Sequence, residues 1–264
     1  MLHLLKIEWL KVKNYRTFWI LTALFFLSLY GVNYIAYYIQ SRSIPRDNGM
    51  AQAIIGTPPF QFPDVWQTVT YLSGFLLFIP GLLMIISVTN EYSYKTHRQN
   101  IIDGLSRTQF IMVKILLTFI IALASTIVVF LTALAFGLYE GVVAFTFEKI
   151  EYVAYFFIQA LTYSAIALLF GVLFKRSGIA IGVFFLFVTV LERMLSALTS
   201  HYISGAGDFF PIRASANLIP FPFFRNLINK MIETPSAMYL LIASAIYLFV
   251  YYFISKRKFE TDDL

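Results

Sequence analysis

Cysteine is absent from this 264-residue sequence, and charged residues make up only 13% of it. Without cysteine the chain forms no disulfide and holds no metal through thiolates. Its three histidines, at positions 3, 97 and 201, are too scattered for a helical metal motif such as H-E-x-x-H. Neither a phosphate-binding G-x-x-x-x-G-K-[ST] loop nor a nucleophile elbow G-x-S-x-G occurs. We therefore expect no catalytic residue, no metal and no bound cofactor in this chain.

Long apolar runs dominate instead, since 59% of the residues are hydrophobic and the mean hydropathy is +0.74. Five runs lack Asp, Glu, Lys and Arg, and a sixth is interrupted only by Glu192 and Arg193. A helix of about 20 apolar residues crosses roughly 30 Å of hydrocarbon, so we predict an all-α integral membrane protein with six spans. The connections are too short for a separate folded domain, so residues 1–264 should form one transmembrane domain. The expected spans are Thr17–Ile39, Val69–Thr89, Ile115–Gly137, Tyr152–Phe174, Ile179–Leu198 and Ala237–Ser255.

The distribution of positive charge indicates the topology. If the N-terminus is inside, the cytoplasmic segments carry 13 of the 20 Lys and Arg residues but only 6 of the 14 Asp and Glu residues. Cytoplasmic loops are enriched in Lys and Arg, so both termini are predicted to be cytoplasmic. The net charge of +6 is then explained by topology, and no nucleic-acid partner is expected. The stretch Met1–Tyr15 fits a helix at the inner interface, or a polar leader that only orients the first span.

Two connections are unlike ordinary loops. The cytoplasmic stretch Asn90–Lys114 is long and places apolar side chains among charges, so it should lie on headgroups or fill a groove on a soluble protein. The glycines and prolines of Thr199–Ser236 exclude a continuous span, while its phenylalanines should bring it back toward the bilayer as broken helices. Within it, the periodicity from Phe223 to Glu233 predicts an amphipathic helix on the outer surface.

The order of residues within Asn90–Lys114 resembles the signature of ABC-2 type transporter permeases. In that family an acidic residue follows the second span, and a Gly-Thr pair, an apolar run, a Ser-Arg pair and a Lys before the third span come after it. The chain departs from this order at Lys95, which stands in place of the Gly. The layout of an interfacial helix, six spans and broken outer helices is similar along the whole chain. The matching residues are Glu91, Tyr92, Thr96, Gly104, Ser106, Arg107 and Lys114.

The resemblance implies that this stretch, including Tyr92, Thr96 and Gly104, is a coupling helix seated in a separate ATPase subunit. That subunit would bind the ATP and Mg. The resemblance further implies an exporter in a prokaryotic cytoplasmic membrane, with two ATPase copies and a second permease chain, identical or related.

Four charged residues of this stretch are candidates for coupling. Glu91 and Arg98 are expected to contact the ATPase or to brace the coupling helix against neighbouring cytoplasmic ends. Arg107 and Lys114 either take part in the coupling or only anchor the third span at lipid phosphates.

Three residues within the spans are candidates for the transport path. Glu192 and Arg193 either contact substrate or form a gate in the outer half of the membrane, or they mark an early end of span five at the interface. Pro80, in the middle of span two, should kink its helix, either as a tolerated bend or as a hinge for conformational cycling.

The kind of substrate is indicated by composition. The spans carry little charge, and the chain has 28 Phe and 17 Tyr, which favours an amphiphilic substrate such as a lipid, a peptide or a drug. Two other functions remain open. One is a non-transporting membrane anchor that recruits a cytosolic partner. The other is an ion-coupled carrier, although no internal repeat and no mid-membrane carboxylate supports it.

Overall fold

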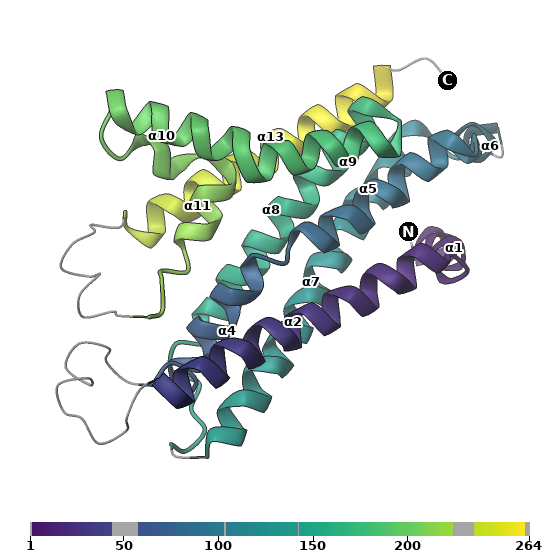
Figure 1. Cartoon of the computed structure of the whole chain (residues 1–264). Coiled ribbons are helices and arrows are strands. Elements are labelled where there is room, and N and C mark those ends of the chain that lie inside the picture. The colour runs from purple at the N-terminus through teal and green to yellow at the C-terminus, as the bar shows by residue number, and fades with distance from the viewer. Residues whose placement is uncertain (1, 44–57, 103, 142, 224–234, 262–264) are drawn as a thin grey trace.

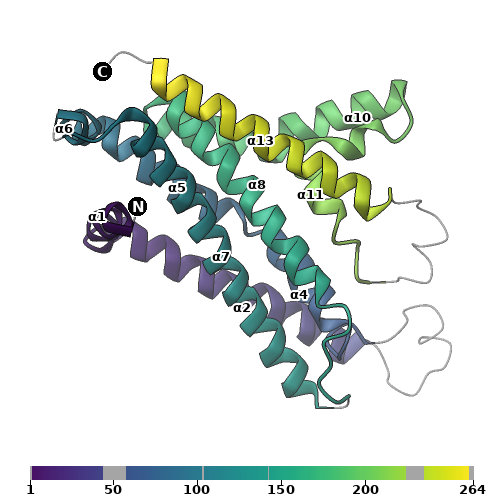
Figure 2. The ribbon, with the colours of Figure 1, turned by 180° about the vertical axis from the view of Figure 1, so that it is seen from behind.

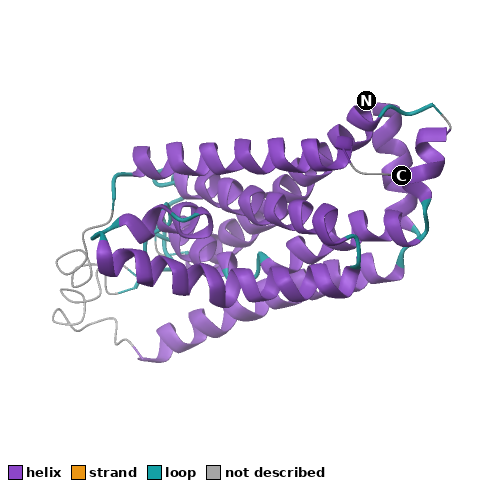
Figure 3. Ribbon diagram, turned by 90° about the horizontal axis from the view of Figure 1, so that it is seen from above, coloured by secondary structure: helices purple, strands orange, loops and turns teal. Residues whose placement is uncertain are grey.

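The computed structural model describes residues 2–43, 58–102, 104–141, 143–223 and 235–261, and these ranges contain helices and no strand. The helices form one elongated bundle (Figures 1 and 3). Helix α1 and the last turn of α13 lie at the same end of this bundle, which we call the termini end; the opposite end is the far end (Figure 1). The all-α prediction is confirmed for the described residues.

The first two helices form an angle at the termini end. Helix α1 (Leu2–Lys13) is separated by a short turn from α2 (Arg16–Ser43), which contains the whole predicted first span. The axis of α1 turns away from that of α2 (Figure 1). The indole Nε1 of Trp19 donates a hydrogen bond to the Lys13 carbonyl at 2.8 Å, which closes the corner between the two helices.

The second span is broken into α4 (Val65–Gly74) and α5 (Phe78–Ser93), which are bent by 48° relative to each other. The break precedes Pro80 by one turn. Proline has no N–H for the carbonyl four residues earlier, and its ring clashes with that carbonyl, here the one of Leu76. The Leu76 carbonyl instead accepts from the Ile79 N–H at 2.9 Å. The bend expected at Pro80 is therefore displaced to residues 75–77, and Pro80 itself lies in the first turn of α5.

The stretch Asn90–Lys114 is not one long loop, because both neighbouring spans extend into it. Helix α5 continues to Ser93, and α7 (Arg107–Glu140) already begins at Arg107, leaving only the short helix α6 (Thr96–Ile102) between them. Gly104, with a φ of +99°, follows α6 in a conformation that favours glycine. Ser106 and Gln109 then form a capping box at the start of α7.

The fourth span, α8 (Glu151–Phe174), is the centre of the bundle. Of its apolar window, 67% is buried, against 28% or less for the other unbroken candidate spans. It contacts α4, α5, α7 and α9 as well as two helices described below, α11 and α13. Figure 2 shows α8 between α7 and α13.

The fifth span changes its helical type partway. Helix α9 (Ser177–Leu186) continues into the π-helical turn η1 (Phe187–Leu191) and then into α10 (Glu192–Tyr202). The chain next folds back through the 3₁₀ turn η2 (Ala206–Phe209) and α11 (Pro211–Asn217). The last span, α13 (Ala237–Thr261), returns the chain to the termini end (Figure 1).

Five described helices, counting the fifth span as one, are long and apolar enough to cross a membrane, and the bent pair α4–α5 supplies a sixth crossing. The predicted runs all fall within these six. Broken helices after the fifth span are present as η2 and α11. The predicted amphipathic helix from Phe223 to Glu233 lies almost wholly outside the described residues.

Candidate functional site

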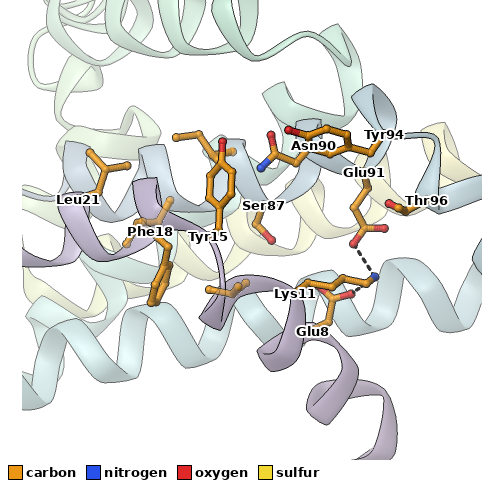
Figure 4. A pocket seen from close by; sticks show the side chains of 13 residues that line it. Glu8, Lys11, Tyr15, Phe18, Leu21, Ser87, Asn90, Glu91, Tyr94 and Thr96 are labelled. Atoms are coloured by element: carbon orange, nitrogen blue, oxygen red, sulfur yellow. Dashed lines mark hydrogen bonds and ion pairs between the residues drawn. The ribbon is translucent and has the colours of Figure 1, made fainter.

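Four charged side chains meet at the termini end, and we call Glu8, Lys11, Glu91 and Lys114 the ionic cluster. Glu8 and Lys11 lie one turn apart on α1, Glu91 lies near the end of α5, and Lys114 lies two turns into α7. The Lys114 ammonium pairs with both Glu8 and Glu91. The Lys11 ammonium lies 2.9 Å from Glu8 Oε1 and 3.1 Å from Glu91 Oε1 (Figure 4). Two carboxylates and two ammonium groups thus join three helices.

Three of the four side chains of the ionic cluster are almost wholly removed from water, and the fourth, Lys11, is 32% exposed. The side chains of Lys114, Glu8 and Glu91 are 1%, 7% and 5% exposed, respectively. Burying unpaired charge is very costly, so such groups are stable only as pairs. Burial alone would raise the pKa of Glu8, but the ammonium groups of Lys114 and Lys11 lower it below its ordinary 4.5. Burial likewise opposes the charged form of Lys11, but the carboxylates of Glu91 and Glu8 raise its pKa above 10.5.

Helix α6 is attached to the ionic cluster by its inner face. The backbone carbonyl of Glu91 accepts a hydrogen bond from Nδ1 of His97 at 2.9 Å. Asn100 Nδ2 donates to Glu91 Oε2 at 3.4 Å. The His97 ring also packs on Tyr92, with centroids 4.8 Å apart. A displacement of α6 therefore acts directly on Glu91.

The outer face of α6 carries different residues. Arg98 and Gln99 are exposed, and Ile102 is 84% exposed. Residues one turn apart lie on the same helix face, so Arg98 and Ile102 share the face opposite His97. An exposed isoleucine beside an arginine at the tip of a bundle suits a protein contact.

A second set of contacts joins the start of α7 to the end of α13. Arg107 Nη1 donates to the Glu260 carbonyl at 2.7 Å, and Thr108 Oγ1 donates to Glu260 Oε1 at 2.7 Å. The rings of Phe110 and Phe259 stack with centroids 4.6 Å apart. Arg107 is thus bound to the C-terminal helix.

The structure distributes the sequence-predicted coupling residues over two environments. Glu91 and Lys114 belong to the ionic cluster, so Lys114, 1% exposed, does not reach a lipid phosphate. Thr96 is half-buried and lines a cavity beside the cluster, which Figure 4 shows. The two cluster residues of α1, Glu8 and Lys11, were not predicted as site residues from the sequence. The available signal was that Glu8 is the sole acidic residue among the first sixteen.

The pair Glu192–Arg193 lies in the half of the fifth span that is nearer the far end, at the start of α10, and Glu192 has a structural role as well. Glu192 is 1% exposed, and its Oε1 accepts hydrogen bonds from the N–H groups of Ile212 at 2.6 Å and Arg213 at 2.9 Å. Its Oε2 is buried without a hydrogen-bond partner among the described residues. Glu192 therefore holds the start of α11 against α10, whereas Arg193 is exposed.

Glu192 and Arg193 also line a cavity of about 430 Å³ between α4, α8, α10 and α11. Its other polar residues come from separate helices, with Tyr71 on α4, Gln159 and Tyr163 on α8, and Arg213 and Asn217 on α11. Pro80 is not among the lining residues. A cavity with aromatic and polar walls can hold a small amphiphile or part of a larger one.

Six apolar crossings and a polar helix joined to them by a buried ionic cluster define a multi-pass α-helical membrane protein. Within the described residues, no group of three or more His, Asp or Glu side chains is placed to hold a metal ion.

The family model described as ABC-2 family transporter protein matches residues 4–192, which is more than half of the chain. The chain therefore belongs to the ABC-2 transporter family, whose members are transmembrane components that pair with an ABC ATPase. No curated protein matches this sequence.

Proposed function

We propose that the chain is the permease subunit of an ATP-driven exporter, and that α6 is the coupling helix on which the ATPase acts. The observation that carries this proposal is the two-faced attachment of α6. Its inner face is bonded to Glu91 through His97 and Asn100, while Arg98 and Ile102 project from its outer face. A movement of an ATPase bound to the outer face of α6 can therefore be transmitted through its inner face to Glu91.

The ionic cluster supplies the path for this movement. Glu91 moves with α6, and its carboxylate is paired with Lys114 of α7 and Lys11 of α1. Separating these charges in a buried site is costly, so the three helices move together rather than apart. Closure of an ATPase dimer on α6 would in this way shift α1, α5 and α7 against the rest of the bundle.

The transported substrate is proposed to be an amphiphile that leaves through the far end. In support, the cavity at Glu192 and Arg193 combines charged groups with the aromatic side chains of Tyr71 and Phe221. The same proposal places the termini end in the cytoplasm of a prokaryotic cell, in agreement with the Lys and Arg count.

The assembly is proposed to contain two permease chains and two ATPase subunits, because one chain offers one coupling helix while such ATPases work in pairs. ATP and Mg would be bound by the ATPase. The second permease chain would be another copy or a related protein.

A crosslinking experiment tests the role of α6. A photoreactive amino acid is placed at Ile102 in the intact membrane, and the crosslinked partner is identified by mass spectrometry. We expect an ATPase with a G-x-x-x-x-G-K-[ST] loop. Tyr139, at the last turn of α7 and 77% exposed, is the matched control and should give no such product.

Changes in the rate of ATP hydrolysis separate transport coupling from passive anchoring. In the co-purified complex, Arg98→Glu should weaken ATPase binding, and Glu91→Ala should keep binding but abolish stimulation of hydrolysis by substrate. If the chain is only a passive anchor, it should bind the ATPase, but substrate should stimulate ATP hydrolysis neither in the wild type nor in Glu91→Ala. If Ile102 crosslinks only to proteins that hydrolyse no nucleotide, the proposed function is wrong.

A further inference from the structure

A cavity of about 150 Å³ lies beside the ionic cluster, between α1, the first turns of α2 and the second half of α5 (Figure 4). A cavity of roughly this volume accepts a benzene-sized apolar group. Its apolar walls are formed by Phe18 and Leu21 of α2 and by Leu83 and Ile86 of α5, all of them half-buried. The cavity is therefore open at the surface of two helices that are candidates for crossing the membrane.

The polarity of the lining changes with depth. Helix α2 runs away from the termini end, so this wall begins with Tyr15, just before α2, and ends with Leu21 of α2 one to two turns deeper. Helix α5 runs toward the termini end. Its lining is therefore apolar at Leu83, deeper in the bundle, and polar at Asn90, nearer the termini end. Both walls are thus polar near the termini end and apolar further in. This gradient is the one a bilayer lipid has along its own length.

The polar end of the cavity offers neutral hydrogen-bonding groups. The side chains of Ser87, Asn90 and Tyr94 on or beside α5, with those of Tyr15 and Thr96, line this end, and none of them forms a hydrogen bond with another residue that the structure describes. The charged residues of the wall belong to the ionic cluster and are paired with one another. A ligand with uncharged acceptors, such as ester carbonyls, matches these donors better than a free ion does.

Positive charge lies next to this end in the sequence. Lys13 and Arg16, which flank the turn between α1 and α2, are both exposed. Basic side chains at a membrane surface attract the phosphate of lipid headgroups. From the surface inward, the site therefore offers cations for a phosphate, then donors for an ester, then an apolar recess for an acyl chain. This is the order of the same groups in a phospholipid.

We propose that this cavity binds one phospholipid from the leaflet at the termini end. Its ester region lies at Ser87 and Asn90, and part of one acyl chain lies between Leu21 and Leu83. Because the walls come from α1, α2 and α5, the bound lipid holds α1 against α5 and so keeps the ionic cluster closed. The site is separate from the cavity at Glu192 and Arg193, where the transported substrate is proposed to bind, and from the outer face of α6, where the ATPase is proposed to bind.

Photolabelling of the full chain tests this site. The protein is placed in nanodiscs of phosphatidylethanolamine and phosphatidylglycerol with a small fraction of a phospholipid that carries a diazirine on its acyl chain. Labelling of the α5 segment 83–87 is measured by mass spectrometry relative to labelling at Phe249, which is 67% exposed on α13. We expect the α5 segment to be labelled more strongly than this reference.

Variants that fill the cavity supply the control. Leu21→Trp should lower the relative labelling of α5 by roughly tenfold, the factor for losing the burial of about two methylene groups. Leu24→Trp, at an exposed position on the same helix, should leave it unchanged. Leu83→Trp fills the same cavity from the other wall, and its effect is measured as labelling of α2. This second variant keeps the test valid if Leu21→Trp fails to fold. Labelling of α5 no stronger than the reference, or unaffected by both cavity-filling variants, would overturn the proposal without touching the proposed function.

Discussion

Removing the Lys114 ammonium is the sharpest test of the ionic cluster. In Lys114→Met the side chain keeps most of its length, but Glu8 and Glu91 are left with Lys11 as their shared counter-ion. Removing one partner of a buried pair costs about 3–5 kcal/mol, because the other charge stays buried. Lys11 continues to pair with both carboxylates and is 32% exposed, so it offsets part of the loss. We expect a cost near the lower limit, about 3 kcal/mol.

Thermal unfolding of the purified chain in detergent measures this cost. For a chain of this size, about 3 kcal/mol lowers the midpoint by roughly 5–10 °C. Hydrogen exchange should become faster in α1 and α6, which the ionic cluster holds, and stay unchanged in α8. Lys6→Met, at an exposed position on α1, is the matched control and should leave the midpoint near the wild-type value.

A second substitution separates buried charge from simple loss of packing. Adding Glu91→Gln to Lys114→Met removes one charge of each sign and leaves the Glu8–Lys11 pair intact. Replacing a buried pair by neutral groups is often close to neutral, so the double variant should regain most of the lost stability. A wild-type midpoint for Lys114→Met, or a double variant less stable than the single one, would refute this account.

Two further predictions concern pH and close packing. The pKa of Glu8 is lowered from 4.5 and that of Lys11 is raised from 10.5. The contribution of Glu8 and Lys11 to stability should therefore be level between these values, fall as acid protonates Glu8 below the lower one, and fall as base deprotonates Lys11 above the upper one. It is measured as the difference in midpoint between the wild type and Glu8→Gln or Lys11→Met, and a difference that already shrinks near neutral pH would contradict this. Gly81→Ala should destabilise the chain by about 1–3 kcal/mol, because its new Cβ would overlap the buried Phe184 ring. Gly182→Ala, with open space around it, should be harmless in the same unfolding assay, and equal effects of both would refute the packing argument.

Much of the fold was predictable from the sequence, because a bilayer leaves few solutions for long uncharged runs. All six runs, from Thr17–Ile39 to Ala237–Ser255, fall in helices or, for the second, in a bent pair. The boundaries were less predictable. Helix α7 begins eight residues before the run at Ile115, since Lys114 is paired with Glu8 and Glu91 and so can lie inside a helix. A charge usually ends a predicted span, but a paired charge need not.

The candidate site was only half visible in the sequence. Glu91 and Lys114 were identified through the resemblance to a family, but their partners Glu8 and Lys11 lie more than 75 residues away along the chain. Pairing over that distance is set by the angle between α1 and α2, which no local pattern specifies. Glu192 shows the same limit. Its contact with α11 depends on the chain folding back after Tyr202.

The π-helical turn η1 lets the fifth span serve two neighbours. In an α-helix each residue advances by about 100° around the axis, so an extra residue in one turn rotates everything after it by about that angle. Before η1, Phe184 faces α5 at Gly81; after it, Glu192 faces α11. The two halves of this span therefore face different directions. The half before η1 makes an apolar contact with α5, and the half after it makes a hydrogen-bonded contact with α11 through the Glu192 carboxylate. If η1 were an ordinary α-helical turn, Glu192 would point away from α11 and could no longer accept hydrogen bonds from the N–H groups of Ile212 and Arg213.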